Sequence, residues 1–207
     1  MMRDRILAWL TDNVPDSRLQ HILRVEEMSA QLAAIHNLDV AKAAQAGLMH
    51  DLAKYFKSQR LLTIARAEGL ELDPVVQANP HLLHAEVGAI VARETFGIKD
   101  EEILQAIANH TLGRPNMDLL SCTVFLADSL EPGRGDTPEL EALRHKSRQN
   151  IYQAVWQTCD YALKYLVERH LLIHPRMILT RNWAIQVDKH SQQVAQTNRN
   201  PLSANAG

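Results

Sequence analysis

The stretch "GLMHDLAKYF", residues 47–56, places a histidine and an acid side by side at the end of an apolar run. Leu48, Met49 and Leu52 indicate that the backbone is entering a core at this point. Burying an unpaired carboxylate costs several kcal/mol, so buried charges are normally paired or bound to a metal ion. The rest of the chain should therefore contain groups that compensate Asp51.

Length and composition favour one domain without a strongly charged partner. The chain has 207 residues, 46% hydrophobic residues and a net charge of -2, which is enough for one substantial core. The near-balanced charge argues against a general nucleic-acid binder. The N-terminus lacks a signal-peptide pattern, and no apolar run approaches the roughly 18 to 20 residues of a membrane span. We expect a soluble cytoplasmic protein with no nucleic-acid or membrane partner.

Helical periodicity dominates the chain and predicts an all-α fold. The expected helices cover about 16–37 (capped by Asp16 or Ser17), 39–51, 58–69, 81–96, 100–110, 118–130, 139–172 (capped by Thr137, with Pro138 first) and 175–194. Residues 72–80 form a connector with two prolines, and Gly97 is a good helix stop. "TVFLA", residues 123–127, has strand-like composition but no partner strand, so we interpret it as a buried helix. Residues 1–195 are expected to form one domain, followed by a polar, disordered tail at 196–207.

Four residues form a candidate metal site because each falls on, or at the end of, an expected helix. They are His21, the pair His50 and Asp51, and Asp128, which follows the apolar "VFLA". Adjacent helical side chains diverge by about 100°, but at a helix end both can bend toward one ion. Two imidazoles and two carboxylates suit Fe, Mn or Co better than Mg. Spacing alone would not decide the matter, because a lone inward histidine is more often a hydrogen-bonded core residue.

The order His…His-Asp…Asp resembles the signature of the HD-domain superfamily of metal-dependent phosphohydrolases. Within it the chain is similar to the YqeK family, bacterial symmetrical diadenosine tetraphosphatases. The resemblance is carried by "RLQHILRVEEMSAQLA", "AGLMHDLAKYF", "HLLHAEVGAIVARETFGIKDEEILQAIANHTLGRPNMDLL" and "VFLADSLEPGR", which together span residues 18–134. One departure is Ser129, where the family commonly has a basic residue.

The resemblance implies an HD-type helical bundle with extra C-terminal helices and a divalent-metal cofactor. His21, His50, Asp51 and Asp128 would hold the metal, which we expect to be iron, with manganese or cobalt as alternatives and one or two ions present. A water activated by the metal would attack the polyphosphate bridge of diadenosine tetraphosphate and release two ADP.

Further residues are expected around the phosphates. His84 and His110 would act in catalysis together with Asp51, by hydrogen-bonding to or protonating the leaving phosphate, or by holding a second metal ion. Lys54 lies three residues after Asp51 and could neutralise a phosphate as a point charge.

Four more candidates would bind substrate. Thr111 and Gly113 follow His110 at a helix end, where a hydroxyl and a close backbone can contact a phosphate or ribose. Arg134 lies between two glycines and suits bidentate phosphate contact. Arg18, three residues before the first ligand, is expected over the same cleft.

The remaining histidines and large aromatic residues are interpreted as structural. Surface or capping roles without supporting partners are expected for His36, His145, His170, His174 and His190. Core or helix-packing roles, rather than base stacking, are expected for Trp156, Tyr161 and Trp183.

Two other functions remain open. The chain could be a different HD-domain enzyme, such as a nucleotidase or another nucleotide phosphohydrolase. It could also be a nucleotide-binding regulator without turnover, although that would predict a missing ligand, and all four ligand positions are filled. A homodimer is compatible with either.

Overall fold

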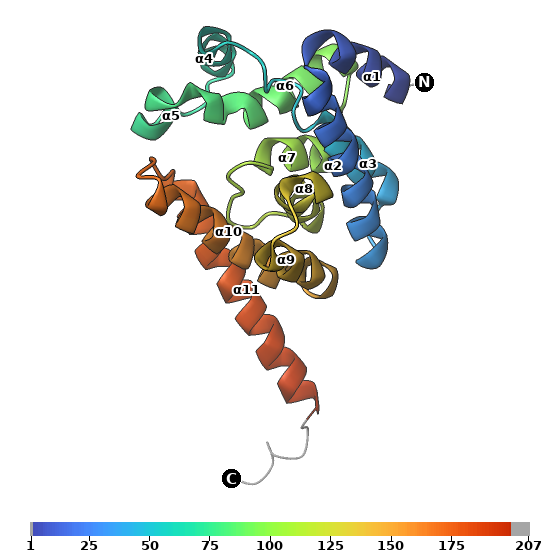
Figure 1. Ribbon diagram of the computed structural model, residues 1–207, viewed down its shortest axis with the longest axis vertical. Helices are drawn as coiled ribbons and strands as arrows, with labels where there is room; N and C mark the ends of the chain where they lie inside the picture. Colours follow the sequence, from blue (N-terminus) through green and yellow to red (C-terminus); the bar gives the residue numbers. More distant parts are fainter. Residues whose placement is uncertain (1, 200–207) are drawn as a thin grey trace.

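The computed structural model describes residues 2–199, and side chains through residue 194 (Figure 1). Every regular element in this range is helical. The α-helices are α1 (Met2–Asn13), α2 (Asp16–Ile35), α3 (Val40–Met49), α4 (Ser58–Ala67), α5 (Pro74–Ala78), α6 (His84–Phe96), α7 (Glu101–Asn109), α8 (Leu119–Leu130), α9 (Pro138–Gln149), α10 (Ile151–Glu168) and α11 (Pro175–Arg199). Two short 3-10 helices, η1 (Pro80–Leu83) and η2 (Pro132–Arg134), complete the set. The all-α expectation is confirmed.

Helix α8 is the central element. It contacts α2, α3, α7, α9 and α10, and nine of its twelve residues are buried. The segment "TVFLA" within it is helical, as predicted, because a helix that is apolar on all sides can be covered by neighbours on all sides. One core cluster lies among α1, α3, α4, α6 and α7, and a second lies among α8, α9, α10 and α11. Residues of α2 contribute to both.

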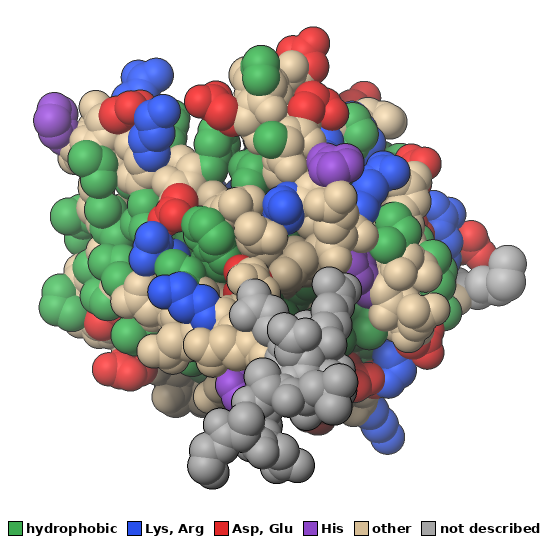
Figure 2. All heavy atoms as spheres, turned by 90° about the horizontal axis from the view of Figure 1, so that it is seen from below, with side chains coloured by type: hydrophobic (Ala, Val, Ile, Leu, Met, Phe, Trp, Pro, Cys, Tyr) green, Lys and Arg blue, Asp and Glu red, His purple; other side chains and the backbone are tan. Residues whose placement is uncertain are grey.

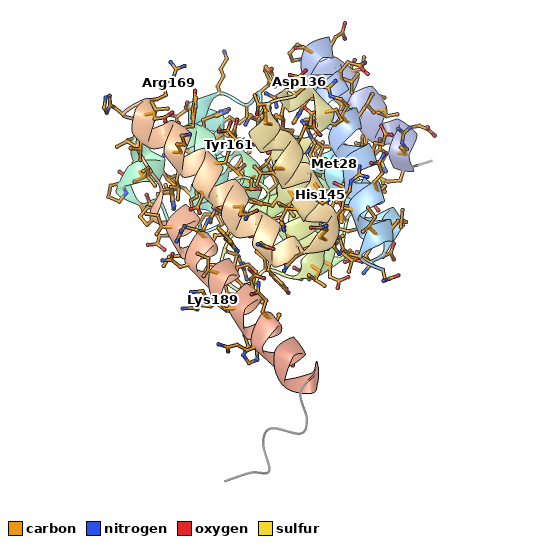
Figure 3. All side chains as sticks on the ribbon, turned by 60° about the horizontal axis from the view of Figure 1, so that its bottom comes forward. Met28, Asp136, His145, Tyr161, Arg169 and Lys189 are labelled. Carbon is orange, nitrogen blue, oxygen red and sulfur yellow. The ribbon has the colours of Figure 1, made fainter. Side chains whose placement is uncertain are left out.

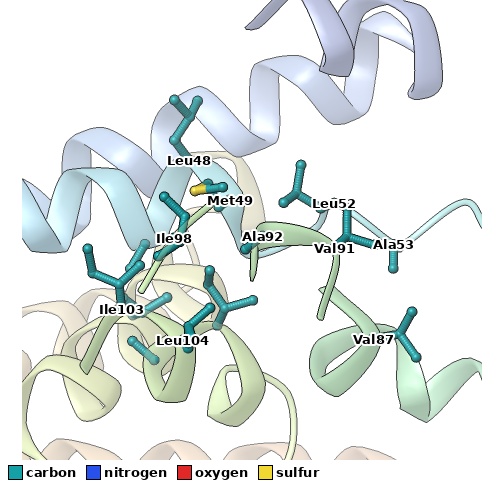
Figure 4. Packing of buried hydrophobic residues seen from close by; sticks show 14 of the residues in the cluster. Leu48, Met49, Leu52, Ala53, Val87, Val91, Ala92, Ile98, Ile103 and Leu104 are labelled. Atoms are coloured by element: carbon teal, nitrogen blue, oxygen red, sulfur yellow. The ribbon is translucent and has the colours of Figure 1, made fainter. Parts of the chain in front are cut away.

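The His50-Asp51 pair leaves α3 at the edge of the first cluster, as the opening stretch predicted. Leu48, Met49 and Leu52 are buried in the same cluster as Val91 of α6 and Ile103 of α7 (Figure 4). Each fully buried aliphatic side chain contributes roughly 1.5–3 kcal/mol to stability. This packing therefore fixes the positions of His50 and Asp51, which lie between Met49 and Leu52 in the sequence.

Local capping groups set several helix ends. Thr137 caps α9 with Pro138 at its first position, and Gly97 ends α6 in the left-handed conformation (φ 72°), both as predicted. Asp100 and Asp118 cap α7 and α8 through their carboxylates. The predicted side-chain cap of α2 is wrong, since Pro15 is the N-cap and makes no side-chain hydrogen bond.

One helix was not predicted, and two expected elements are wrong. The N-terminal segment forms α1, and the expected connector at 72–80 contains α5, whose first turn is capped by Asp73. The single helix expected at 139–172 is divided at Asn150, which leaves the helical region (φ -150°) and caps α10 with its side chain. In the C-terminal region α11 is helical through Arg199, and residues 200–207 of the expected tail lie outside the described residues.

The surface carries both charge signs. Figure 2 shows Lys and Arg side chains interspersed with Asp and Glu on the face seen from below. Among the described residues, none of the helices combines the length and hydropathy that a bilayer crossing requires. Both cysteines, Cys122 and Cys159, are buried free thiols.

Candidate metal centre and active site

The four predicted metal ligands converge from three directions. His21 comes from α2, His50 and Asp51 from the end of α3, and Asp128 from α8. The distance from His21 Nε2 to Asp128 Oδ1 is 3.1 Å, and His50 Nε2 lies 3.4 Å from Asp51 Oδ2 and 3.7 Å from Asp128 Oδ1. Residues more than a hundred positions apart therefore present their polar atoms to one small volume. We call these four residues the first ligand group.

Hydrogen bonds fix which nitrogen of each imidazole faces the centre. Nδ1 of His50, His84 and His110 lies 2.7 Å from the carbonyl oxygen of Gly47, His81 and Ile107, respectively. Because a carbonyl only accepts, each Nδ1 must donate, and a neutral imidazole then has its lone pair on Nε2. His21 follows the same rule, with Nδ1 donating to the Glu131 carboxylate at 3.0 Å. All four lone pairs are thereby available to a cation.

The residues present fit a divalent metal. Nε2 of His21 and of His50 are buried and have no hydrogen-bond partner among the described residues. Leaving such atoms unpaired costs roughly 1–3 kcal/mol each. His21, His50 and Asp51 offer ligand atoms that all lie within 4.8 Å of one another. A bound cation would satisfy both nitrogens. Together with the Arg18 guanidinium it would compensate the buried Asp51 carboxylate, which answers the question that Asp51 raised.

A second ligand group consists of Asp51, His84 and His110, with ligand atoms again within 4.8 Å. Asp51 is shared, since its Oδ1 lies 3.4 Å from His84 Nε2 and 3.7 Å from His110 Nε2. The two histidine Nε2 atoms are 3.1 Å apart, and both are acceptors. The Thr111 hydroxyl lies 3.1 and 3.0 Å from them, and the Lys54 ammonium is 3.2 Å from His84 Nε2. Protein donors thus occupy the place that a second cation would take.

Electrostatics keeps the carboxylates ionised. Burial by itself would raise the pKa of Asp51, but the neighbouring His50, His110 and Lys54 hold it well below its usual range. Burial likewise opposes ionisation of Asp128, but the neighbouring His21, His50 and Arg134 lower its pKa strongly. Anionic oxygens are the form that a metal requires.

The histidines divide into two kinds. Burial lowers the pKa of His84 and, with the charge of His50, lowers that of His110 to about 4, so both are neutral near pH 7. For His50 burial acts in the same direction, but the Asp51 carboxylate outweighs it and raises the pKa. A proton and a metal ion therefore compete for His50 Nε2.

Two arginines border the first ligand group. Arg18 donates to Asp51 Oδ2 at 3.0 Å, and its contact with substrate stays a prediction. Arg134 makes two hydrogen bonds to Asp128. Its Nη2 donates to Oδ1 at 2.5 Å, and its Nε donates to the backbone oxygen at 2.7 Å. Its side chain is partly exposed and so lies at the rim of the site.

Glu131 is a site residue that the sequence analysis missed. It is 1% exposed and accepts from His21 Nδ1, from Arg24 and from the backbone N–H of Gly133. A carboxylate on the outer nitrogen of a metal-binding imidazole fixes the ring orientation and strengthens the ligand. The available signal was its position three residues after Asp128, which places it on the same side of the chain as that ligand.

The structure gives a packing reason for Gly113. Its φ is +59°, and a Cβ there would lie 2.5 Å from Cγ2 of Thr180 on α11. The glycine therefore permits a close approach between the "HTLGR" segment and α11. Its contact with substrate stays a prediction.

The interpretation of the remaining histidines as structural residues without partners is correct for some and wrong for others. His145, His170 and His190 are exposed, as expected. The absence of partners is wrong for His36, which bonds the Ser147 carbonyl at 2.7 Å, and for His174, which lies 2.6 Å from Asp73.

Among the aromatic residues, the packing interpretation suits two of three. Trp156 donates to Asp188, and Trp183 packs edge-on against Tyr152. A core role is wrong for Tyr161, which is 39% exposed, because it lines a hollow beside Asp128 instead of packing in the protein core.

Comparison with known proteins agrees with this geometry. Residues 18–133 match the family described as HD domain. A symmetrical bis(5'-nucleosyl)-tetraphosphatase from Halalkalibacterium halodurans is 35% identical over 88% of this chain and 96% of its own. One of the same name from Bacillus subtilis is 31% identical over 89% and 98%.

A solved structure from Clostridium acetobutylicum has the same fold. It is described as a predicted HD superfamily hydrolase involved in NAD metabolism, and it superimposes with a TM-score of 0.84 at 36% identity, covering 88% of this chain and 96% of that one. The family match covers more than half of the chain and contains every residue of both ligand groups. The protein therefore belongs to the HD domain family and is a metal-dependent phosphohydrolase of that superfamily.

Proposed function

We propose that the protein cleaves diadenosine tetraphosphate symmetrically and releases two ADP. The observation that carries this proposal is the meeting of four imidazole lone pairs with the buried Asp51 carboxylate and the partly buried Asp128 carboxylate, beside the cationic side chains of Arg18 and Arg134. Relatives that match almost the full chain are named as symmetrical tetraphosphatases, which supports the choice of substrate.

The first ligand group would hold the metal, which we propose to be iron, with manganese or cobalt as functional substitutes. When bound, the ion supplies Lewis acidity and lowers the pKa of a coordinated water. The chain's own contribution is to keep Asp51 and Asp128 anionic and to turn the Nε2 atoms of His21 and His50 inward.

Side chains around the second ligand group would position the phosphates. The Lys54 ammonium and the Thr111 hydroxyl are donors that a phosphate oxygen can accept from. His84 and His110 have committed their Nδ1 protons to backbone carbonyls, so they act as acceptors toward Lys54 or a second cation. This differs from the expected role of protonating the leaving phosphate. Arg18 and Arg134 would bind phosphate oxygens of the polyphosphate at the rim of the site.

Product analysis tests the proposal. The purified protein, reconstituted anaerobically with Fe²⁺ and separately with Mn²⁺ or Co²⁺, is incubated with diadenosine tetraphosphate, and the products are separated by ion-exchange chromatography. ADP as the only nucleotide product is expected. ATP with AMP, release of inorganic phosphate, or intact substrate with every metal would reject the proposal in favour of another nucleotide phosphohydrolase or a binding protein.

A pair of variants ties turnover to the site. Asp128→Ala removes a ligand and should abolish ADP formation. Asp12→Ala makes the same change at an exposed position on α1 and should leave turnover unchanged.

A further inference from the structure

A groove opens beside the first ligand group and leads away from it along α10. Its volume is about 340 Å³. Asp128, Ser129 and Arg134 line the end next to the metal centre, and Thr158, Tyr161 and Tyr165 line the length of it. The groove is therefore continuous with the place where the phosphates are proposed to bind.

Two aromatic rings form one wall of the groove. Tyr161 and Tyr165 are four residues apart on α10, so they project from the same face of the helix. Their exposed fractions are 39% and 54%, whereas Val155 and Cys159 on the opposite face are buried in the core. The position of Tyr161 on α10 can be followed in Figure 3. The core does not require these rings. The Arg169 guanidinium lies 5.7 Å from the centroid of the Tyr165 ring, and both rings are still exposed to solvent.

We propose that this groove binds the nucleoside part of the substrate, with Tyr161 and Tyr165 forming the surface on which the base stacks. The inference rests on the proposed function for the identity of the nucleotide. A flat heterocyclic base matches an aromatic wall, while the phosphate next to it meets Arg134 where the groove reaches the metal centre.

Size and chemistry agree with one nucleoside as the occupant. Small-molecule pockets are typically about 300–1,000 Å³, mostly apolar, with a few polar groups that fix orientation. The groove lies near the lower limit, which suits one base and ribose rather than a whole dinucleotide. Ser129 and Arg134 in its lining supply the polar groups that can fix the orientation of a ligand.

The test compares a ligand that has a base with one that has none. Dissociation constants of ADP and inorganic pyrophosphate are measured by calorimetry on Mn²⁺-loaded wild type, Tyr161→Ala and Tyr165→Ala. Because base–aromatic stacking typically contributes about 1–3 kcal/mol, each variant should lose about tenfold in ADP affinity and keep its pyrophosphate affinity. Tyr161→Phe and Tyr165→Phe should keep both. Leu172→Ala removes an exposed apolar side chain outside the groove and is the matched control.

Each result supports or overturns the proposal that the groove binds the nucleoside, whether or not the proposed reaction occurs. Unchanged ADP affinity in both alanine variants, equal losses for ADP and pyrophosphate, or no preference for ADP in the wild type would overturn it. If the wild type forms no ADP from diadenosine tetraphosphate, the proposed function fails, yet the selective loss of ADP over pyrophosphate still decides the groove. If ADP forms but binding is insensitive to both tyrosines, the groove alone is rejected.

Discussion

The two ligand groups share Asp51 but meet the cost of burial in different ways. In the first group, Nε2 of His21 and of His50 lack any hydrogen-bond partner among the described residues. In the second group, the Thr111 hydroxyl and the Lys54 ammonium approach the corresponding atoms of His84 and His110. The first group therefore has lone pairs that a cation could satisfy, whereas the second can be satisfied by the protein. We therefore propose that the first group is the primary metal position.

The largest effect is expected from Asp51→Ala, because this residue belongs to both groups. The variant should lose its metal and its turnover, by about a thousandfold or more, since a metal ion contributes several kcal/mol of transition-state stabilisation. Elemental analysis and ADP formation measure the two losses. Asp12→Ala is the control. A variant that retains stoichiometric metal would contradict the assignment of Asp51 as a ligand.

The comparison itself is tested by substituting one histidine from each group. His50→Ala should lose nearly all bound metal, while His84→Ala should retain one ion per chain and lose only part of its turnover, about a hundredfold. Metal content and turnover are measured side by side after the same loading. Equal metal loss in the two variants would show that the groups are not distinct.

Glu131→Gln sharpens the account of the first group. The amide keeps the size of the side chain but removes the negative charge next to His21 and Arg24. Metal affinity should fall by about 10–100-fold, as is typical when the outer partner of a metal-binding imidazole is changed. A competitive chelator titration gives the constant. If affinity is unchanged, Glu131 serves only to hold Arg24 and η2 in place.

The smallest effect is expected from Lys54→Ala, because the Lys54 ammonium contacts His84 of the second group and neither histidine of the first. Metal bound by the first group should be unaffected, while KM for the tetraphosphate should rise about tenfold, because a hydrogen bond to a charged group contributes about 1.5–3 kcal/mol. Steady-state kinetics at saturating metal measures this. A loss of metal with unchanged KM would place Lys54 in a structural role instead.

The sequence predicted that the four residues of the first ligand group converge, because residue type and apolar context both point to it; that they bind a metal stays a prediction. A histidine or acid within an apolar run must be compensated, and His21, Asp51 and Asp128 all carry that mark. Glu131 carries no such mark, since its burial depends on Arg24 and on a turn that folds back over α2. Contacts across 110 positions cannot be read from local pattern.

The fold shows the same difference between features set by local sequence pattern and features set by contacts between distant residues. Helices with strong periodicity and a clear cap were predicted within a few residues, but the break at Asn150 was not. Apolar spacing continues from α9 into α10, and the break is stabilised by a bond from Asn150 to Asp188, which comes from α11. The exposure of Tyr161 is also a tertiary property, since it depends on which face of α10 the core covers.

The carbonyl bonds of His50, His84 and His110 have a consequence for how the site fails. Each ring is held by a backbone oxygen three residues earlier, and two of the rings stand directly at helix ends, where carbonyls lack helical partners. Backbone carbonyl oxygens therefore determine which nitrogen of each of these three rings carries the proton. Fraying of a single turn would release a ring to its other tautomer, so cation loss on warming should precede global unfolding.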